Sequence, residues 1–333
     1  MKVAVTGGAG YIGSHALVRL TEAGHEPLVI DNLCQGHAEA VRGARSVVLE
    51  LKEEAQVEQV LKEFGADAVM HFAASASVAD SARDPETYYF NNVVTTLGLL
   101  RAMRRLGIPR FVFSSSCTVY GIPGAVPITE DFPMQPLSPY GRTKAHIEGI
   151  LADYALAYGL KYASLRYFNA SGAMPDGSLG EDHDPETHLI PLAIRAAMGK
   201  RSALEVLGGD YPTPDGTCIR DYVHVLDLAS AHVLAMEALD ERAPLIYNLS
   251  TGCGHSVREV IDAVGEVTGL KVPVVEGARR PGDAPILVGN SERIRRELGW
   301  QPQFPGLKEI VETAWEWHRS HPEGFGGGMA AHA

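Results

Sequence analysis

Residues 2–24 read KVAVTGGAGYIGSHALVRLTEAG. The first part, Val3 to Thr6, is short, apolar and rich in β-branched side chains, and it predicts a buried strand. A glycine-rich turn follows, and the apolar residues after it recur at helical spacing until Gly24. A strand–turn–helix unit of this kind presents backbone N–H groups and the positive end of a helix dipole, which together bind phosphate.

The three spaced glycines of this turn have separate expected roles. Gly7 makes the tight turn, Gly10 lets a pyrophosphate approach the backbone, and Gly13 lets the helix pack closely on the strand. The Gly-x-x-Gly-x-x-Gly spacing differs from the Gly-x-Gly-x-x-Gly of most dehydrogenases, and 35 glycines in the chain raise the chance of a coincidental match. The position between a predicted strand and a predicted helix favours dinucleotide binding.

A second predicted strand, Leu28 to Ile30, ends in Asp31. A carboxylate at this position accepts hydrogen bonds from the ribose hydroxyls of adenosine and repels a 2′-phosphate. We therefore predict NAD rather than NADP as the cofactor.

The composition is that of an ordinary globular protein, with 45% hydrophobic and 21% charged residues among 333. The formal net charge of −12 argues against nucleic acid or an anionic membrane as a partner. The four cysteines form no Cys-x-x-Cys pair, no signal peptide precedes the first strand, and no apolar run reaches membrane length. We expect a cytoplasmic protein with free thiols.

Predicted strands and helices alternate through the first half of the chain. The helices stop at glycines, and the strands between them are continuously apolar, which indicates a parallel sheet covered on both faces. The helices are expected at 53–64, 91–106 and 140–158, and the strands at 68–72, 111–113 and 163–167. The fold class is therefore α/β, a doubly wound parallel sheet of the Rossmann type, with ligands at the carboxyl ends of the strands.

Long loops rich in glycine, proline and aspartate appear after about residue 169. Residues 225–250 look like a helix and strand that rejoin the main sheet. We therefore predict an NAD-binding domain of 1–168 plus about 225–250, and a smaller C-terminal α/β lobe for the substrate from about 169–224 plus 251–320. Residues 324–333 are predicted to be a flexible tail. His183 and His188 lie in or beside an acidic loop, but their spacing matches no familiar set of metal ligands, so we expect a solvated loop and no metal.

A second group of residues indicates a catalytic function. Ser138 and Pro139 begin the predicted helix 140–158 as cap and first-turn residue, and Tyr140 and Lys144 then share one face of it. A lysine ammonium near a phenol favours phenolate, and so does the charge of an oxidised nicotinamide, so Tyr140 can act as the base in alcohol oxidation. A Tyr-x-x-x-Lys pair is common on solvated helices, and it gains meaning from the glycine turn and Asp31.

Ser116 follows the predicted strand 111–113 at its carboxyl end, within Ser114-Ser115-Ser116. A hydroxyl there can hydrogen-bond the reacting oxygen and relay its proton. A serine-rich loop that merely closes a strand is the alternative, and the presence of the other parts favours the catalytic role.

With these parts in place, the chain resembles the extended short-chain dehydrogenases/reductases and, within them, the UDP-glucose 4-epimerase family. The resemblance runs from Lys2 to about residue 320. Beyond the motifs above, it is carried by 71–74 (HFAA), 88–92 (YYFNN), 114–121 (SSSCTVYG), 165–169 (LRYFN), 215–225 (DGTCIRDYVHV) and 279–283 (RRPGD). The last stretches distinguish this family from simple alcohol dehydrogenases.

The resemblance implies a tightly held NAD and no external redox partner. It implies that Tyr140 as phenolate takes the proton of the 4-hydroxyl of a UDP-hexose, with Ser116 in the hydrogen-bond path. Hydride passes from C4 to the nicotinamide, the 4-keto sugar turns, and hydride returns to its other face. The catalytic residues are then Ser116, Tyr140 and Lys144, and Lys144 also bonds the nicotinamide ribose.

The resemblance also implies the binding residues. Besides Gly7, Gly10, Gly13 and Asp31, the cofactor contacts are Tyr11, Ile12, Asn32, Glu50, Leu51, Phe72, Ala73, Ala74, Asn91, Ser114, Tyr140, Lys144 and Phe168. The substrate contacts are Ser116, Tyr140, Asn169, His188, Leu189, Arg220, Arg280, Asp283 and Leu287. Among these, Arg220, Arg280 and Asn169 hold the diphosphate, Asp283 contacts the uridine ribose, and Leu189 lines the uracil pocket. Without the resemblance, the two arginines would be read as surface salt bridges.

Three positions depart from the family pattern. Leu49-Glu50 stands where the family often has Gly-Asp, whose aspartate bonds adenine. Ala76 stands where some members carry a lysine near the cofactor. Leu287 stands at the position that sets the width of the sugar pocket, and its intermediate size leaves the choice between plain and N-acetyl hexoses open.

Several alternatives remain at this point. A 4,6-dehydratase or decarboxylase is disfavoured because Cys117-Thr118 replaces the carboxylate-bearing pair that those relatives place before Val-Tyr-Gly. A 4-epimerase of UDP-N-acetylhexosamine or UDP-pentose, or a non-catalytic NAD-binding scaffold, is left open. Fold relatives dimerise through helices such as 91–106 and 140–158, so the resemblance implies a homodimer.

Overall fold

The computed structural model describes residues 1–280 and 282–327. A sheet of seven strands runs through the larger part of the molecule in the order β10-β6-β5-β4-β1-β2-β3. Every neighbouring pair in it is parallel. The strands are β1 (Lys2–Thr6), β2 (Glu26–Asp31), β3 (Arg45–Val48), β4 (Ala68–His71), β5 (Arg110–Ser116), β6 (Lys161–Tyr167) and β10 (Leu245–Leu249). The predicted doubly wound fold is confirmed, and the return through 225–250 does rejoin this sheet.

Helices cover both faces of this sheet because its strands are apolar on both sides. One apolar core gathers α1 (Tyr11–Glu22) and α8 (Val225–Arg242) over one face. A second core gathers α2 (Glu54–Phe64), α5 (Thr95–Leu106) and α6 (Pro139–Tyr158) over the other. The two layers leave the carboxyl ends of the strands as the edge where loops carry polar side chains.

The helix ends follow the local sequence closely. Gly65, Gly107 and Gly159 end α2, α5 and α6 in the left-handed conformation, which glycine adopts without steric cost. Ser138 caps α6 by accepting a hydrogen bond from the Gly141 N–H at 3.1 Å. The predicted helix 91–106 differs at its start, because Tyr89–Val94 form a π-helical turn before α5 begins.

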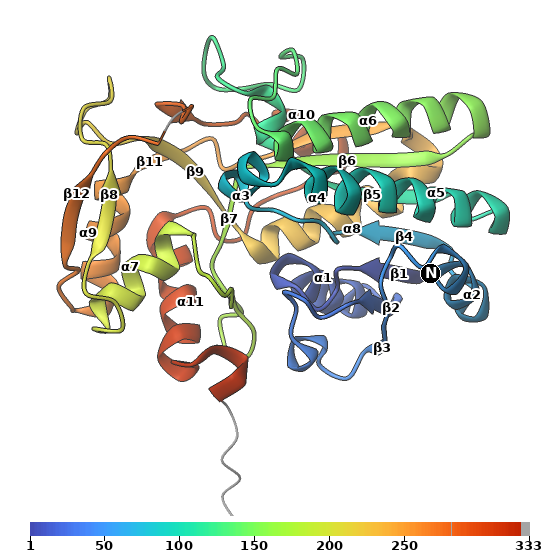
Figure 1. Ribbon diagram of the computed structural model, residues 1–333, viewed down its shortest axis with the longest axis horizontal. Coiled ribbons are helices and arrows are strands. Elements are labelled where there is room, and N and C mark those ends of the chain that lie inside the picture. Colours follow the sequence, from blue (N-terminus) through green and yellow to red (C-terminus); the bar gives the residue numbers. More distant parts are fainter. Residues whose placement is uncertain (281, 328–333) are drawn as a thin grey trace, which may run out of the picture.

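The remaining elements gather beside the carboxyl ends of the large sheet, on the left in Figure 1. Strand β9 pairs with three short strands, and β8 pairs with β12 in a separate two-stranded sheet. Three helices bury a third apolar core around these strands. The strands are β7 (Asn169–Ser171), β8 (Leu204–Leu207), β9 (Ile219–His224), β11 (Gly254–Ser256), β12 (Val274–Gly277) and β13 (Ile286–Leu287), and the helices are α7 (Leu189–Ala197), α9 (Val257–Thr268) and α11 (Leu307–Ser320). The domain boundaries given above remain a proposal, which this arrangement supports.

Short elements complete the chain. They are α3 (Val78–Arg83), α4 (Pro85–Tyr88), α10 (Glu292–Leu298) and 3-10 turns at Ala38–Val41, Cys117–Tyr120 and Gly324–Gly327. The predicted flexible tail lies largely outside the described residues, but its first four residues form the last of these turns. There the Phe325 N–H donates to Asp182 at 2.9 Å, and the Phe325 ring lies 4.7 Å from that of Trp317. Within the described ranges, the helices lack the combination of length and apolarity needed to cross a bilayer.

Buried histidines make this fold sensitive to acid. Burial lowers the pKa of His71 and His224 to about 3 and that of His232 to about 4, whereas the unfolded value is about 6.5. Because the folded protein keeps these rings neutral, their contribution to stability is complete above the unfolded pKa and is lost as pH falls toward the folded values. We expect each to remove about 2 kcal/mol of stability between pH 7 and pH 5.

The variant His232→Leu tests this pH dependence, because it removes the titrating ring from an apolar site on α8. Urea denaturation at a series of pH values from 7.5 to 5 is expected to show a shallower loss of stability than in the unmodified protein. The exposed His146 supplies the control His146→Gln, which should leave the slope unchanged. If stability falls with pH as steeply in His232→Leu as in the unmodified protein, His232 does not contribute to the sensitivity to acid.

Candidate functional site

The glycine turn after β1 has the geometry that its sequence predicts. Gly7 lies in the left-handed region at φ +71°, and a Cβ there would stand 2.5 Å from the Ala73 nitrogen. A Cβ on Gly13 would stand 2.2 Å from the Gly7 carbonyl oxygen, so α1 can pack on β1 only with glycine at this position. Gly10 differs, because a Cβ there would meet nothing closer than 3.4 Å. The protein itself does not require glycine at Gly10, and the open backbone beside it fits a dinucleotide pyrophosphate.

The carboxylate of Asp31 ties the end of β2 to this turn. It accepts the Ala9 N–H at 3.0 Å on one oxygen and the Leu33 N–H at 2.9 Å on the other. Each oxygen keeps a further lone pair with which it can accept a ribose hydroxyl. Glu50, which lies after β3, accepts a hydrogen bond from the Asn32 amide at 3.2 Å. The structure therefore brings Asp31, Asn32 and Glu50 together at one edge of the predicted adenosine site.

The segment after β4 lies against the glycine turn. The Phe72 and Ala73 N–H groups both donate to the Thr6 carbonyl, at 2.9 and 3.1 Å. Ser75 next connects this segment to the π-helical turn, because its hydroxyl accepts a hydrogen bond from the predicted cofactor residue Asn91 at 3.1 Å. A π-turn inside a helix is often found at functional sites.

Asn92 was not predicted as a site residue, yet it connects the cofactor side to the catalytic helix. Its buried amide accepts the Ser75 N–H at 2.8 Å and donates to the Thr143 hydroxyl on α6 at 3.0 Å. Thr143 lies between Tyr140 and Lys144, so Asn92 fixes α6 relative to the loop after β4. The sequence shows only one more polar residue beside Asn91, which has no meaning until its partners are known.

Tyr140 and Lys144 lie together on the buried side of α6, with 8% and 3% of their surfaces exposed. The Lys144 ammonium lies 5.7 Å from the centre of the Tyr140 ring and donates to the Ser114 carbonyl at 2.8 Å. Strand β5 thus holds Ser114 and Ser116 beside the helix that carries the tyrosine and lysine. The three predicted catalytic residues and Ser114 occupy one place at the carboxyl end of β5.

Ser116 is held in place by Thr118. Its hydroxyl oxygen accepts hydrogen bonds from the Thr118 N–H and hydroxyl, at 3.2 and 2.9 Å. Tyr167 faces Ser116 in the β5–β6 register, and its hydroxyl lies 2.7 Å from that of Ser114. Thr118 and Tyr167 are further members of this site, and neither is among the predicted site residues.

The electrostatics of the polypeptide differ from the expectation for Tyr140. Burial raises the pKa of Tyr140, nearby Tyr167 raises it further, and the Ser116 hydroxyl lowers it. Burial also lowers the pKa of Lys144 to about 7, against the opposing effect of Glu148. The lowering of the Tyr140 pKa that the Tyr-x-x-x-Lys spacing suggested is therefore not present in the polypeptide by itself, because desolvation of the phenol dominates. Additional positive charge beside the phenol favours its ionised form.

The predicted substrate residues on β9 and β13 are brought together. Arg220 pairs with Leu287 in the β13–β9 register and forms an ion pair with Asp283. Asn169 on β7 pairs with Tyr222, two residues further along β9. Arg280 is exposed on the loop that carries Asp283. The Phe168 ring packs tightly on Gly289, where a Cβ would stand 2.3 Å from it. A set of charged and polar side chains thus lies beside the carboxyl ends of the strands of the large sheet.

The other predicted contacts are placed as follows. Tyr11 is buried, and its hydroxyl donates to the Gly172 carbonyl at 2.6 Å, so its contact with a cofactor is limited to the backbone of the turn. Leu189 begins α7, and His188 is the residue before it. Ile12, Leu51 and Ala74 are partly exposed beside the elements just described.

The loop that contains His183 and His188 is solvated only in part: Asp184, Thr187 and His188 are exposed, but the two glutamates are buried. Glu181 and Glu186 are 3% and 9% exposed. The Trp317 indole donates to the Glu181 carbonyl at 3.0 Å, and the His183 ring packs edge-on against Tyr11 at 6.2 Å. Residues distant in the sequence bury the two glutamates of this polar loop, and local composition could not reveal them.

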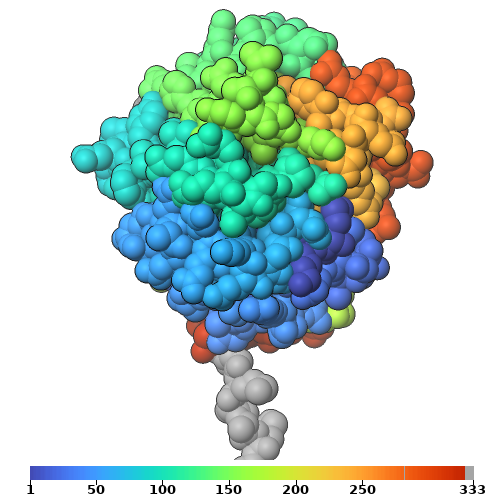
Figure 2. Space-filling view, turned by 90° about the vertical axis from the view of Figure 1, so that its right-hand side faces the viewer, coloured from blue at the N-terminus to red at the C-terminus, as the bar shows by residue number. Residues whose placement is uncertain are grey.

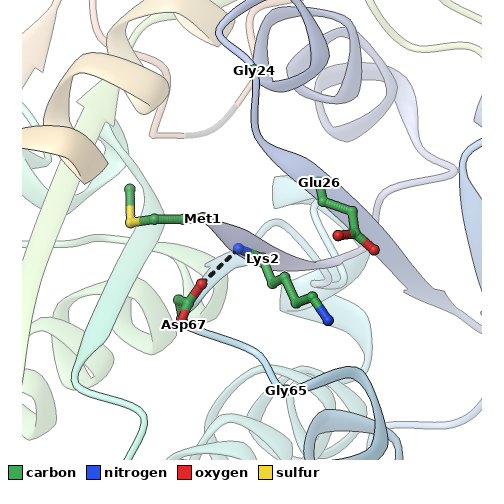
Figure 3. Close-up of a pocket in the computed structure, with 6 residues that line it drawn as sticks. All are labelled: Met1, Lys2, Gly24, Glu26, Gly65 and Asp67. Carbon is green, nitrogen blue, oxygen red and sulfur yellow. Dashed lines mark hydrogen bonds between the residues drawn. The ribbon is translucent and has the colours of Figure 1, made fainter.

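A surface hollow elsewhere on the molecule is not the functional site. It lies at the amino ends of the strands and is lined by Met1, Lys2, Gly24, Glu26, Gly65 and Asp67, with the Lys2 N–H donating to Asp67 at 2.8 Å (Figure 3). The N-terminal residues, dark blue in Figure 2, lie on that face. The predicted catalytic and binding residues are absent from this lining, and all the catalytic ones lie at the opposite edge of the sheet.

Comparison with known proteins identifies the family. The model of the NAD dependent epimerase/dehydratase family matches residues 3–250. The chain belongs to this family. The matched range contains the whole seven-stranded sheet of this epimerase/dehydratase-family protein, together with the glycine turn, Ser116, Tyr140 and Lys144.

Individual relatives are similar over nearly the full length. A curated UDP-glucose 4-epimerase from Lacticaseibacillus casei is 46% identical over 328 residues, which cover 98% of this chain and 99% of that protein. The crystal structure of UDP-glucose 4-epimerase from Brucella ovis in complex with NAD is 50% identical, with a TM-score of 0.92 over 94% of this chain and 97% of that one. The UDP-glucose 4-epimerase from Bifidobacterium longum in complex with NAD+ and UDP is 36% identical, with a TM-score of 0.94 over 98% and 100%.

Two glycine variants of this epimerase/dehydratase-family protein separate folding from cofactor binding. Gly13→Ala is expected to destabilise the protein by at least about 1–3 kcal/mol, because the backbone oxygen of Gly7 cannot move away. Gly10→Ala has room for its methyl group, so its stability without cofactor should be nearly unchanged. Its NAD affinity should fall on the order of tenfold or more, which is about 1.4 kcal/mol. Thermal unfolding measures the change in stability, and calorimetric titration measures the change in NAD affinity. The assigned roles would be contradicted if the two variants changed stability and affinity equally.

Proposed function

We propose that this chain catalyses the reversible epimerisation of UDP-glucose and UDP-galactose at C4 on a tightly bound NAD, as a UDP-glucose 4-epimerase. The observation that carries the proposal is the placement of Ser116, Tyr140 and Lys144 at the carboxyl end of β5, joined through Asn92 and Ser75 to the loop beside the glycine turn. The three relatives compared above, at 36–50% identity, are UDP-glucose 4-epimerases. They do not favour the N-acetylhexosamine, pentose or scaffold alternatives.

The three catalytic residues have separate roles in the proposed reaction. Tyr140, as phenolate, accepts the proton of the sugar 4-hydroxyl and later returns it. Its hydroxyl lies in a buried site beside Ser116. Ser116 holds the reacting oxygen in the path of that proton. Lys144 places a cationic group 5.7 Å from the Tyr140 ring and is fixed there by the Ser114 carbonyl. The nicotinamide, when bound, supplies reversible hydride acceptance at C4.

The nucleotide end of the substrate requires an anchor remote from C4, because the sugar must turn while UDP stays in place. Arg220, Asn169 and Arg280 are proposed for the diphosphate, since guanidinium groups match phosphate oxygens in geometry and charge. Asp283 is proposed for the uridine ribose and Leu189 for uracil. The Arg220–Asp283 ion pair supports this assignment, because it holds the guanidinium in position before substrate arrives.

The purified protein, with no NAD added, tests the proposed function on UDP-galactose and separately on UDP-N-acetylgalactosamine. Formation of UDP-glucose without an added oxidant supports a self-contained epimerase with retained NAD. A silent protein is next assayed with added NAD, because Glu50 replaces the aspartate expected near adenine. Continued silence with NAD shown to bind contradicts the proposal. Conversion of the second substrate reports whether Leu287 admits the N-acetyl group.

A homodimer belongs to the same proposal. Large apolar side chains are exposed on or next to α5 and α6, including Leu156 at 91%, Tyr158 at 56% and Val94 at 49%. Sedimentation equilibrium measures the assembly state directly, and a monomer at micromolar concentration would contradict it. The cytoplasmic location remains a prediction from the sequence.

A further inference from the structure

Two histidines and two glutamates of the loop before α7 converge on one point. Their ligand atoms are the Nδ1 atoms of His183 and His188 and one carboxylate oxygen each from Glu181 and Glu186, and all four lie within 4.8 Å of one another. His183 Nδ1 lies 3.1 Å from Glu181 Oε1 and 3.9 Å from Glu186 Oε1. His188 Nδ1 lies 3.9 Å from Glu186 Oε1 and contacts Glu181 Oε1 directly.

These separations suit a metal ion. Four ligands around a tetrahedral Zn²⁺ with bonds of about 2.0–2.2 Å stand about 3.3–3.6 Å apart. The distances between the ligand atoms of the cluster lie on both sides of that value, and each residue contributes one ligand atom. A tetrahedral site requires His188 and Glu181, which are in direct contact, to move apart and both histidines to approach Glu186 from 3.9 Å.

A second observation points to a cation. Glu186 Oε1 accepts the N–H groups of Thr187 and His188 at 2.7 and 2.8 Å. Oε2 of the same carboxylate is buried and has no hydrogen-bond partner among the described residues, although only 1% of the side chain is exposed. A buried carboxylate oxygen without a donor is costly. Oε1 is the Glu186 oxygen nearer both histidine Nδ1 atoms, so an ion would satisfy Oε2 by binding both oxygens of this carboxylate.

We propose that Glu181, His183, Glu186 and His188 bind one divalent first-row transition-metal ion, for which Zn²⁺ is the probe. Two imidazole nitrogens select such an ion over Mg²⁺ or Ca²⁺, which prefer all-oxygen sites. Two carboxylates and two neutral imidazoles cancel the charge of the ion, so the buried site is neutral overall. With four protein ligands the coordination is complete, which is typical of a structural rather than a catalytic zinc site.

The position of the cluster gives the metal a role in joining parts of the chain. His183 packs against Tyr11 at the start of α1, the Glu181 carbonyl is held by Trp317 of α11, and His188 immediately precedes α7. A metal at this point fixes the loop to all three helices. This inference concerns metal binding alone and does not depend on the proposed function.

The test uses the full-length protein, stripped with a chelator and then reloaded with Zn²⁺ or Co²⁺. We expect one Zn²⁺ per chain after gel filtration, measured by mass spectrometry of the metal, and the visible absorption of tetrahedral Co²⁺. His183→Gln should lose affinity on the order of 100-fold or more, since even outer-shell changes cost up to about 100-fold. His146→Gln changes an exposed histidine on α6 and should bind as the unmodified protein does.

The outcomes separate the possibilities. Failure of the stripped protein to retain Zn²⁺ or Co²⁺ overturns the proposal and leaves a network of hydrogen bonds and ion pairs. Retention that is unchanged in His183→Gln also overturns it, because the ion then lies elsewhere, for example on the exposed Cys34 or Cys253. If circular dichroism shows that His183→Gln is unfolded, His188→Gln, whose side chain is 48% exposed, makes the same comparison.

Discussion

Replacing Tyr140 with phenylalanine is expected to lower kcat for UDP-galactose by about 10²–10⁴-fold, the usual contribution of a general base. The change removes one oxygen atom from a side chain that is only 8% exposed. It keeps the ring that packs beside Lys144. The loss should therefore appear in kcat, while the fold and the retained NAD stay as they are.

The control for this variant lies on the same helix. Tyr158→Phe removes the hydroxyl of an exposed tyrosine on α6 and should leave kcat unchanged. Product formation is measured by chromatography, and retained NAD by its release on denaturation. A Tyr140→Phe enzyme with normal kcat and full NAD would exclude Tyr140 as the base.

Replacing Arg166 with methionine is expected to cost about 3–5 kcal/mol of stability, because it leaves a buried carboxylate without its partner. Arg166 on β6 and Glu148 on α6 are joined by Nη2–Oε2 and Nε–Oε1 contacts of 2.6 and 3.0 Å, and both side chains are at most 5% exposed. The Arg166 guanidinium also donates to the Tyr120 hydroxyl at 2.8 Å. Glu148 accepts the Ser115 hydroxyl at 2.5 Å, so the pair supports the strand that carries Ser114 and Ser116.

A surface ion pair provides the comparison. Arg110 contacts Asp240 at 2.6 Å, but the aspartate is 47% exposed, so Arg110→Met should cost less than about 1 kcal/mol. The double variant Arg166→Met with Glu148→Leu should recover most of the loss, because no unpaired charge remains. The midpoints of urea denaturation rank the four proteins. Equal effects of Arg166→Met and Arg110→Met would mean that burial of the pair contributes nothing.

Much of the fold could be predicted from neighbouring residues alone. The apolar strands, the glycines that end α2, α5 and α6, and the Ser138 cap of α6 depend on interactions within a few residues. Such interactions can be predicted from the order of residues, because backbone conformation and helix capping depend on residues that are close in the sequence. The doubly wound sheet followed from their alternation.

The candidate site could be predicted only in outline. The spacing of Tyr140 and Lys144 placed both on one helical face, but the group that holds Lys144 is a carbonyl 30 residues away. The same spacing suggested a lowered tyrosine pKa, and burial by the folded chain reverses that direction. Asn92 and Tyr167 entered the site only through partners from other elements.

The sequence by itself determined the glycine turn, the alternation of strands and helices, and the residue types able to bind a dinucleotide and move a proton. Only the tertiary structure decided which polar groups are buried together. The loop of Glu181 and His183 shows this most clearly, because its polar composition predicts a solvated loop while contacts with Trp317 and Tyr11 bury part of it. Burial is set by residues distant along the chain. It changes the free-energy cost of a charged side chain, the pKa of that side chain and its need for a hydrogen-bond or ion-pair partner.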